Sequence, residues 1–187
     1  FSLRMKGVLL INLGSPDTTA TKDVKRYLAE FLMDERVIDV AYWKRYLLIK
    51  GIILQIRPKK SGAAYKKIWW DEGSPLVVIS ERFSKKVTKK VEVPVTLAMR
   101  YGSMSMEKGF KELTDQGVDE ILLVPLYPHY AMSSYETVTV KAEQIVAEQY
   151  PNVTMDILPT FYDKPEYIRA MSDNIKNHLD GFEYDHV

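Results

Sequence analysis

The chain contains no cysteine among its 187 residues. It can therefore form neither a disulfide nor a thiolate-ligated metal site, so a bound metal would need histidine or carboxylate ligands. The 26 lysine and arginine residues nearly balance the 25 aspartate and glutamate residues, which leaves a formal net charge of +1. Because a nucleic-acid-binding domain usually carries a clear basic excess, we expect no nucleic-acid partner.

Long apolar runs are also missing. No stretch approaches the roughly 20 apolar residues of a transmembrane helix, and the first apolar run, residues 8–13, is too short for the core of a secretory signal. We therefore expect a cytoplasmic protein. Hydrophobic residues make up 46% of the chain and charged residues 27%, which excludes a disordered or fibrous chain and indicates a folded domain.

Four short apolar segments predict β-strands, at residues 7–13, 95–101, 121–127 and 155–161. The first and third are almost continuously apolar, as is typical of parallel strands buried on both faces. Helical patterns separate or follow them, at residues 75–91, 110–116, 135–150 and 165–180. This alternation predicts one α/β domain, a four-stranded parallel sheet flanked by helices in a Rossmann-like, three-layer arrangement.

The interval between the first two strands is longer than one crossover needs, and its excess predicts a site. One helix is indicated by the spacing of Val24, Tyr27, Leu28, Phe31 and Leu32. Residues 42–56, which we name the lip, are apolar around most of a helix that Gly51 interrupts. Such a helix packs in a core, lies on a membrane surface or borders an apolar pocket. We expect part of the lip's apolar surface, at Trp43, Leu47 and Leu48, to stay uncovered and to face the mouth of the cleft, where it could also contact a membrane.

Ligands of an open parallel sheet bind outside the carboxyl ends of its strands. Leu13, Arg100 and Tyr127 stand at or beside such ends, so we expect them to converge on one edge, with the helices of residues 24–56 over it. Ser74, before Pro75, predicts a helix N-cap that would suit a carboxylate. His129 could titrate near neutral pH, but without an acidic or nucleophilic neighbour in sequence a structural role is the favoured interpretation.

Five segments together resemble the amino-terminal half of ferrochelatases, enzymes that insert ferrous iron into a porphyrin at the end of haem synthesis. They are GVLLINLGSPDT (7–18), YLAEFLMDERVID (27–39), RPKKSGAAYKKIW with EGSPL (57–76), AMRYGSMSMEKGFKEL (98–113) and GVDEILLVPLYPHYAMSSYETV (117–138). The resemblance implies two similar domains with a porphyrin cleft between them. Residues 1–187 would be the amino-terminal domain, with cleft-lip helices at about residues 20–92, and the carboxy-terminal domain would lie outside this chain.

The resemblance also implies which residues bind porphyrin. Leu13 and Phe31 would contact the macrocycle. Arg57, Tyr65 and Ser74 would hold its carboxylates or rim, and Arg100, Tyr101 and Tyr127 would line the floor of the cleft. The expected partners are thus porphyrin, ferrous iron and the missing carboxy-terminal domain.

The family's catalytic base is a histidine in a motif like S-x-H-G-x-P that would follow residue 187, so we expect no catalytic residue and no metal ligand in this chain. His186 precedes that strand and does not match it. An iron–sulfur ligand of some members would fall at Met132, which is no thiolate, so we expect no cluster and no other cofactor from this half. We expect a fragment that folds without inserting iron. Two alternatives stay open: a chelatase for coproporphyrin, another tetrapyrrole or another metal, and a non-catalytic α/β module that binds a small molecule.

Overall fold

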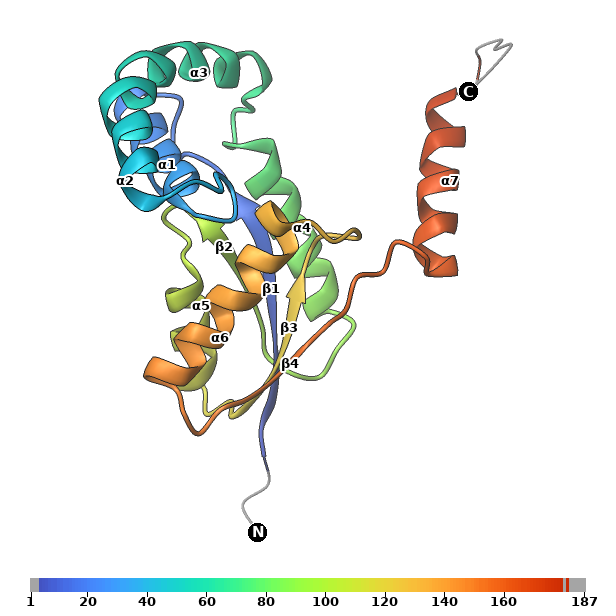
Figure 1. The fold of residues 1–187 in the computed structure, drawn as a ribbon. Helices are drawn as coiled ribbons and strands as arrows, with labels where there is room; N and C mark the ends of the chain where they lie inside the picture. Colours follow the sequence, from blue (N-terminus) through green and yellow to red (C-terminus); the bar gives the residue numbers. More distant parts are fainter. Residues whose placement is uncertain (1–3, 180, 182–187) are drawn as a thin grey trace.

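The sheet is parallel and has four strands, as predicted. The computed structural model describes residues 4–179 and 181. The strands, in the spatial order β2-β1-β3-β4, are β1 (Lys6–Gly14), β2 (Val95–Tyr101), β3 (Glu120–Pro125) and β4 (Thr154–Ile157), shown in Figure 1. The almost continuously apolar strands β1 and β3 take the two central places. β4 is shorter than predicted and ends before Pro159, whose nitrogen carries no hydrogen for a ladder bond.

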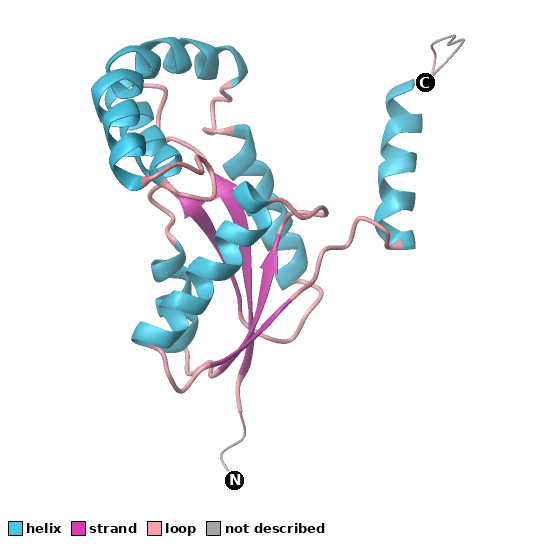
Figure 2. Cartoon of the chain, viewed as in Figure 1, coloured by secondary structure: helices cyan, strands magenta, loops and turns pink. Residues whose placement is uncertain are grey.

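Helices cover both faces of the sheet and make the predicted three layers (Figure 2). On one face lie α5 (Met106–Asp115) and α6 (Thr137–Gln149), which bury a core with β1 and β3. On the other face α4 (Pro75–Thr88) packs against β1 and β2. There the Asn12 side-chain amide donates a hydrogen bond to Ser80 Oγ (3.0 Å). α5 begins four residues earlier than predicted, because the Ser105 side chain caps it by accepting from the Lys108 backbone N–H.

A second group of helices lies beyond the carboxyl ends of the strands, at the end to which the arrowheads point in Figure 1. It comprises α1 (Thr21–Met33), α2 (Tyr42–Tyr46), the π-helix η1 (Leu47–Ile53) and α3 (Leu54–Ile68). Their own core of Val24, Tyr27, Leu28, Leu32, Ile49 and Leu54 reaches the sheet at Tyr101. The expected inserted segment, residues 20–92, thus contains these site-forming helices and also α4, which covers the sheet.

The lip is helical throughout but is not one regular helix. It consists of α2, the π-helix η1 and the first residues of α3. Gly51 lies within η1, and Pro58 follows inside α3; both residue types weaken a regular helical ladder. Ile49 and Leu54 are buried, whereas Trp43, Leu47 and Leu48 are 62%, 61% and 40% exposed. The prediction that part of its apolar surface stays uncovered is therefore confirmed.

The last helix within the described residues is α7 (Pro165–Leu179), which stands apart from the sheet and has no buried residue (Figure 1). It confirms the last predicted helix as far as Leu179; Asp180 and His186 fall outside the described residues. The short π-helix η2 (Met132–Glu136) leads into α6. Across residues 4–179, no helix has the length and apolar character needed to span a membrane.

Candidate functional site

The carboxyl ends of the strands meet at one edge of the sheet. In the parallel register Gly14 of β1 pairs with Tyr101 of β2, and Ile11 pairs with Pro125 of β3. Leu13, Arg100 and Tyr127 therefore lie at the same edge, below α1 and α3, and the predicted convergence is confirmed. The close approach of the ends of β1 and β2 depends on Gly14, which has a φ of 105° and lies against the backbone of Tyr101.

An apolar cavity of about 440 Å³ opens between α1 and α3. Its lining consists of Leu28, Phe31, Leu32, Arg57, Ser61, Ala64, Tyr65 and Ile68. The Phe31 ring stacks on that of Tyr27 at 5.9 Å and meets the Tyr101 ring edge-on at 5.2 Å, so a row of aromatic rings supports one side of the cavity. The structure thus brings together three of the residues selected from the sequence, Phe31, Arg57 and Tyr65.

Three polar side chains line this cavity, those of Arg57, Ser61 and Tyr65. Arg57 is exposed and forms no ion pair with any residue that the structure describes. The Tyr65 hydroxyl is a neutral donor at neutral pH, and burial raises its pKa further above the ordinary tyrosine value. A mostly apolar lining with one guanidinium and two neutral hydroxyls suits an apolar ligand that carries a carboxylate.

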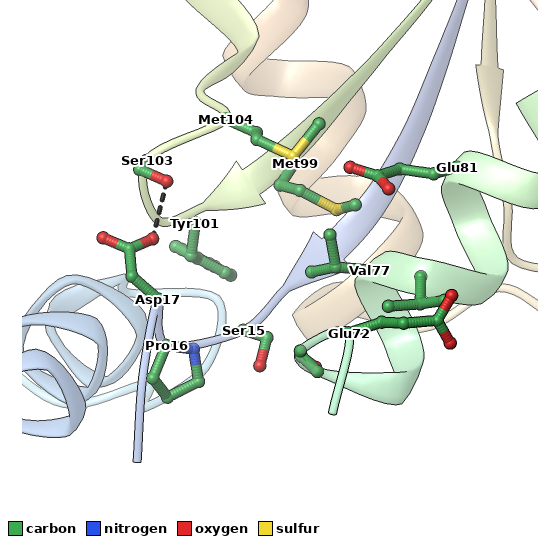
Figure 3. A pocket seen from close by; sticks show the side chains of 13 residues that line it. Ser15, Pro16, Asp17, Glu72, Val77, Glu81, Met99, Tyr101, Ser103 and Met104 are labelled. Carbon is green, nitrogen blue, oxygen red and sulfur yellow. Dashed lines mark hydrogen bonds between the residues drawn. The ribbon is translucent and has the colours of Figure 1, made fainter. Parts of the chain in front are cut away.

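Ser74 lines a different cavity, of about 300 Å³. That cavity lies between the ends of β1 and β2 and the start of α4 (Figure 3). Ser103 Oγ donates to Asp17 Oδ1 across its rim (2.6 Å), and Glu72 and Glu81 also line it. Ser74 occupies the predicted N-cap position of α4, but its side chain makes no capping hydrogen bond. The structure therefore separates Ser74 from Arg57 and Tyr65.

A hydrogen-bond network surrounds Arg100 at the edge of the sheet. Its Nη2 bonds to Asp34 Oδ2 (2.5 Å), and its Nε donates to the carbonyl (3.0 Å) and the hydroxyl (2.9 Å) of Thr137. Asp34 Oδ2 also accepts from the Tyr101 hydroxyl (2.9 Å) and from Thr137 Oγ1 (2.6 Å). The network joins the end of α1, the end of β2 and the start of α6.

Asp34 is ionised at neutral pH. Burial by itself raises its pKa, but hydrogen bonds from Thr137, the Arg36 backbone N–H and Tyr101, together with the charge of Arg100, outweigh burial and lower the pKa. Sequence reasoning missed this residue, although it lies inside the motif YLAEFLMDERVID. No local pattern marks it, since Thr137 is 103 positions away; its place directly after Met33, the last residue of the helix, was the one signal.

The remaining predicted residues, Leu13, Tyr101 and Tyr127, are more buried than Arg57. Tyr101 is 1% exposed, so it supports Phe31 and Arg100 from below rather than forming an open surface. Leu13 is half-buried against the same cluster. The Tyr127 hydroxyl is buried and has no hydrogen-bond partner among the described residues. Burial, reinforced by the nearby Tyr101 and Tyr27, raises the pKa of Tyr127, so this hydroxyl is an unused neutral donor.

Side chains that could hold a metal are scattered. His129 is exposed and stacks on Tyr162 at 5.4 Å, and Met132 is 46% exposed at the start of η2. Over the described part of the chain, no three His, Asp or Glu side chains are grouped to bind a metal ion.

Comparison with known proteins adds a family match. The family model described as Ferrochelatase matches residues 5–187. A ferrochelatase of Pseudomonas fluorescens biotype C is 44% identical over 181 residues, which is 96% of this chain and 53% of the relative. A ferrochelatase of Ectopseudomonas mendocina (strain ymp) is 46% identical over 179 residues, 95% of this chain and 52% of the relative. The chain thus spans about half the length of these curated relatives.

Proposed function

Because this chain belongs to the ferrochelatase family, we propose that it is the porphyrin-binding part of an enzyme that inserts ferrous iron into protoporphyrin IX, the last step of haem biosynthesis. The observation that supports this most directly is the apolar cavity between α1 and α3, in which Arg57 has no ion-pair partner among the described residues. A porphyrin is a flat apolar disc with acidic arms. It needs a broad apolar contact surface and a cationic donor at its edge.

Five side chains of the cavity lining have distinct parts in this proposal. Leu28, Phe31 and Leu32 contact the macrocycle, and the guanidinium of Arg57 pairs with a carboxylate arm. The neutral Tyr65 hydroxyl donates a hydrogen bond to the same edge. The ring must then bend so that its nitrogen lone pairs leave the plane, and a base must accept two pyrrole protons as iron enters. We assign the holding of the ring to this chain and the base to the carboxy-terminal half that the family resemblance implies.

Porphyrin titration tests the proposal. Protoporphyrin IX added to the purified chain is expected to quench tryptophan fluorescence saturably. Arg57→Met is expected to weaken binding about tenfold, because a charged hydrogen bond is lost, and Tyr65→Phe about threefold, because the lost hydrogen bond is neutral. Lys60→Met, an exposed position of α3 outside the cavity, is the matched control and should bind like wild type.

Equal affinity of the Arg57→Met and wild-type chains would contradict the proposed carboxylate contact. The same titration with coproporphyrin separates the two substrate classes, because its extra carboxylates need donors beyond Arg57 and Tyr65. A chain that bound neither porphyrin would favour the α/β module that binds another small molecule.

We further propose a cytoplasmic protein whose lip contacts a membrane surface while a poorly soluble porphyrin is loaded. Trp43, Leu47, Ile52 and Ile56 are 62%, 61%, 55% and 57% exposed, and Lys44 and Lys50 lie among them. Apolar side chains interleaved with lysines favour the surface of an anionic bilayer.

Sedimentation with phosphatidylglycerol vesicles tests this contact. The double variant Trp43→Ser, Leu47→Ser is expected to reduce the vesicle-bound fraction at least about fivefold, since each large apolar side chain contributes over roughly 1 kcal/mol when buried. The control is Ile168→Ser, Ile175→Ser on α7, where the residues removed are 53% and 45% exposed. If both double variants lost binding equally, the contact would not be specific to the lip.

A further inference from the structure

We propose that Asp34 is a positioning residue that orients the Arg100 guanidinium toward the bound porphyrin. The inference rests on the proposed function, because it assumes that the ligand reaches the edge of the sheet at Arg100. It concerns a residue that is not part of the apolar cavity lining and acts through another side chain.

The hydrogen bonds of Arg100 define one orientation. Nη2 is held by Asp34 and Nε by Thr137, while the central carbon of the guanidinium lies 4.4 Å from the centre of the Tyr101 ring. Within residues 4–179, Nη1 has no hydrogen-bond partner. Two of the three nitrogens are thus used to fix the group, and the third is left to donate to a ligand.

Asp34 is itself fixed from several directions. Its Oδ1 accepts from the Arg36 backbone N–H (2.9 Å), and Arg36 Nε bonds to Glu136 Oε1 (3.1 Å) just before α6. The carboxylate therefore cannot turn without breaking several of these bonds. A long arginine side chain held this way has already lost its rotational freedom, so a ligand does not have to order it.

The pair also neutralises a charge at the edge of the sheet. The side chains of Arg100 and Asp34 are 14% and 8% exposed, so both ions are largely desolvated and neutralise each other. Arg100 consequently acts as a directed donor and not as a free cation. Removing Asp34 would leave a buried, uncompensated guanidinium that is free to swing toward solvent.

Porphyrin titration of Asp34→Asn is the first test. We expect about a tenfold loss of affinity, because the charged hydrogen bond that orients Arg100 is lost. Asp23→Asn is the matched control: Asp23 is also a buried carboxylate of α1, hydrogen-bonded to Thr18 (2.6 Å) and away from Arg100, and its variant should bind like wild type. Thr137→Val keeps the Asp34 charge and the carbonyl acceptor, and should lose about threefold.

A double-mutant cycle separates positioning from general stability. In an Arg100→Gln background, Asp34→Asn is expected to cost no further affinity, because no guanidinium remains to be oriented. Nuclear magnetic resonance supplies a second readout: the Nε–H signal of Arg100 should be sharp and slow to exchange in wild type and in Asp23→Asn, and broadened in Asp34→Asn.

The outcomes are distinct. Absence of porphyrin binding to the wild-type chain would overturn the proposed function and the inference with it. Binding that Asp34→Asn leaves unchanged, or losses that simply add in the Arg100→Gln background, would overturn the inference and leave the proposed function standing.

Discussion

Incubated without oxygen with ferrous iron and protoporphyrin IX, the 187-residue chain is expected to form haem no faster than the two reactants do in buffer. Its cavity supplies apolar contacts and donors, whereas insertion also requires a base for two pyrrole protons. Of its three histidines, His129 is exposed on a stacked ring pair and His178 bonds through Nδ1 to the Asn174 carbonyl; His186 lies outside the described residues. Loss of a placed base typically lowers a rate about 10²–10⁴-fold.

The assay follows the change in porphyrin absorption, with the full-length Pseudomonas fluorescens ferrochelatase as positive control. A chimera that joins this chain to the part of that relative beyond the matched region is expected to recover insertion, because the second half would supply the base and the opposing side of the cleft. Haem formation by the 187-residue chain at the rate of the control would show that the base lies within it, and His129 would be the first residue to replace.

Gly14→Ala is expected to lower the free energy of unfolding by about 4 kcal/mol, the sum of backbone strain and a steric overlap. A Cβ atom on Gly14 would lie 1.9 Å from the carbonyl oxygen of Tyr101, and its φ of 105° disfavours any side chain. The overlap involves backbone on both sides, so no side-chain rotation relieves it. The melting temperature should fall by roughly 10 °C, and porphyrin binding should weaken because β1 and β2 separate at the site.

Substitutions at two other glycines separate the effect of backbone strain from that of steric overlap. Gly73 has a φ of 128°, and a Cβ added there would meet no atom within 4 Å, so Gly73→Ala should cost only the strain, about 1 kcal/mol. Gly51 lies in a helical segment with open space around it, and Gly51→Ala should leave stability unchanged or raise it. Calorimetric unfolding of the three variants would refute the overlap argument if Gly14→Ala and Gly73→Ala were equally stable.

Local signals explain which helices and strands could be predicted. The continuous apolar runs of β1 and β3, the Ser74-Pro75 start of α4 and the Pro165 start of α7 depend on neighbours a few residues apart. Local signals did not predict the helix type at Gly51, because tertiary contacts decide it. The lip keeps a helical path through Gly51 by forming a π-helix, since Ile49 and Leu54 are buried against α1 and its neighbours.

The sequence by itself determined the α/β class, the parallel sheet, the convergence of Leu13, Arg100 and Tyr127, and the uncovered lip, because periodicity and strand direction are read from short segments. Tertiary structure alone decided the strand order, the separation of Ser74 from Arg57 and Tyr65, and the hydrogen-bond partners of Asp34. These depend on which distant segments meet: Asp34 accepts hydrogen bonds from Arg100, 66 positions away, and from Thr137, 103 positions away. No local sequence pattern predicts such long-range contacts, because they form only when the layers pack and buried polar groups form hydrogen bonds with one another.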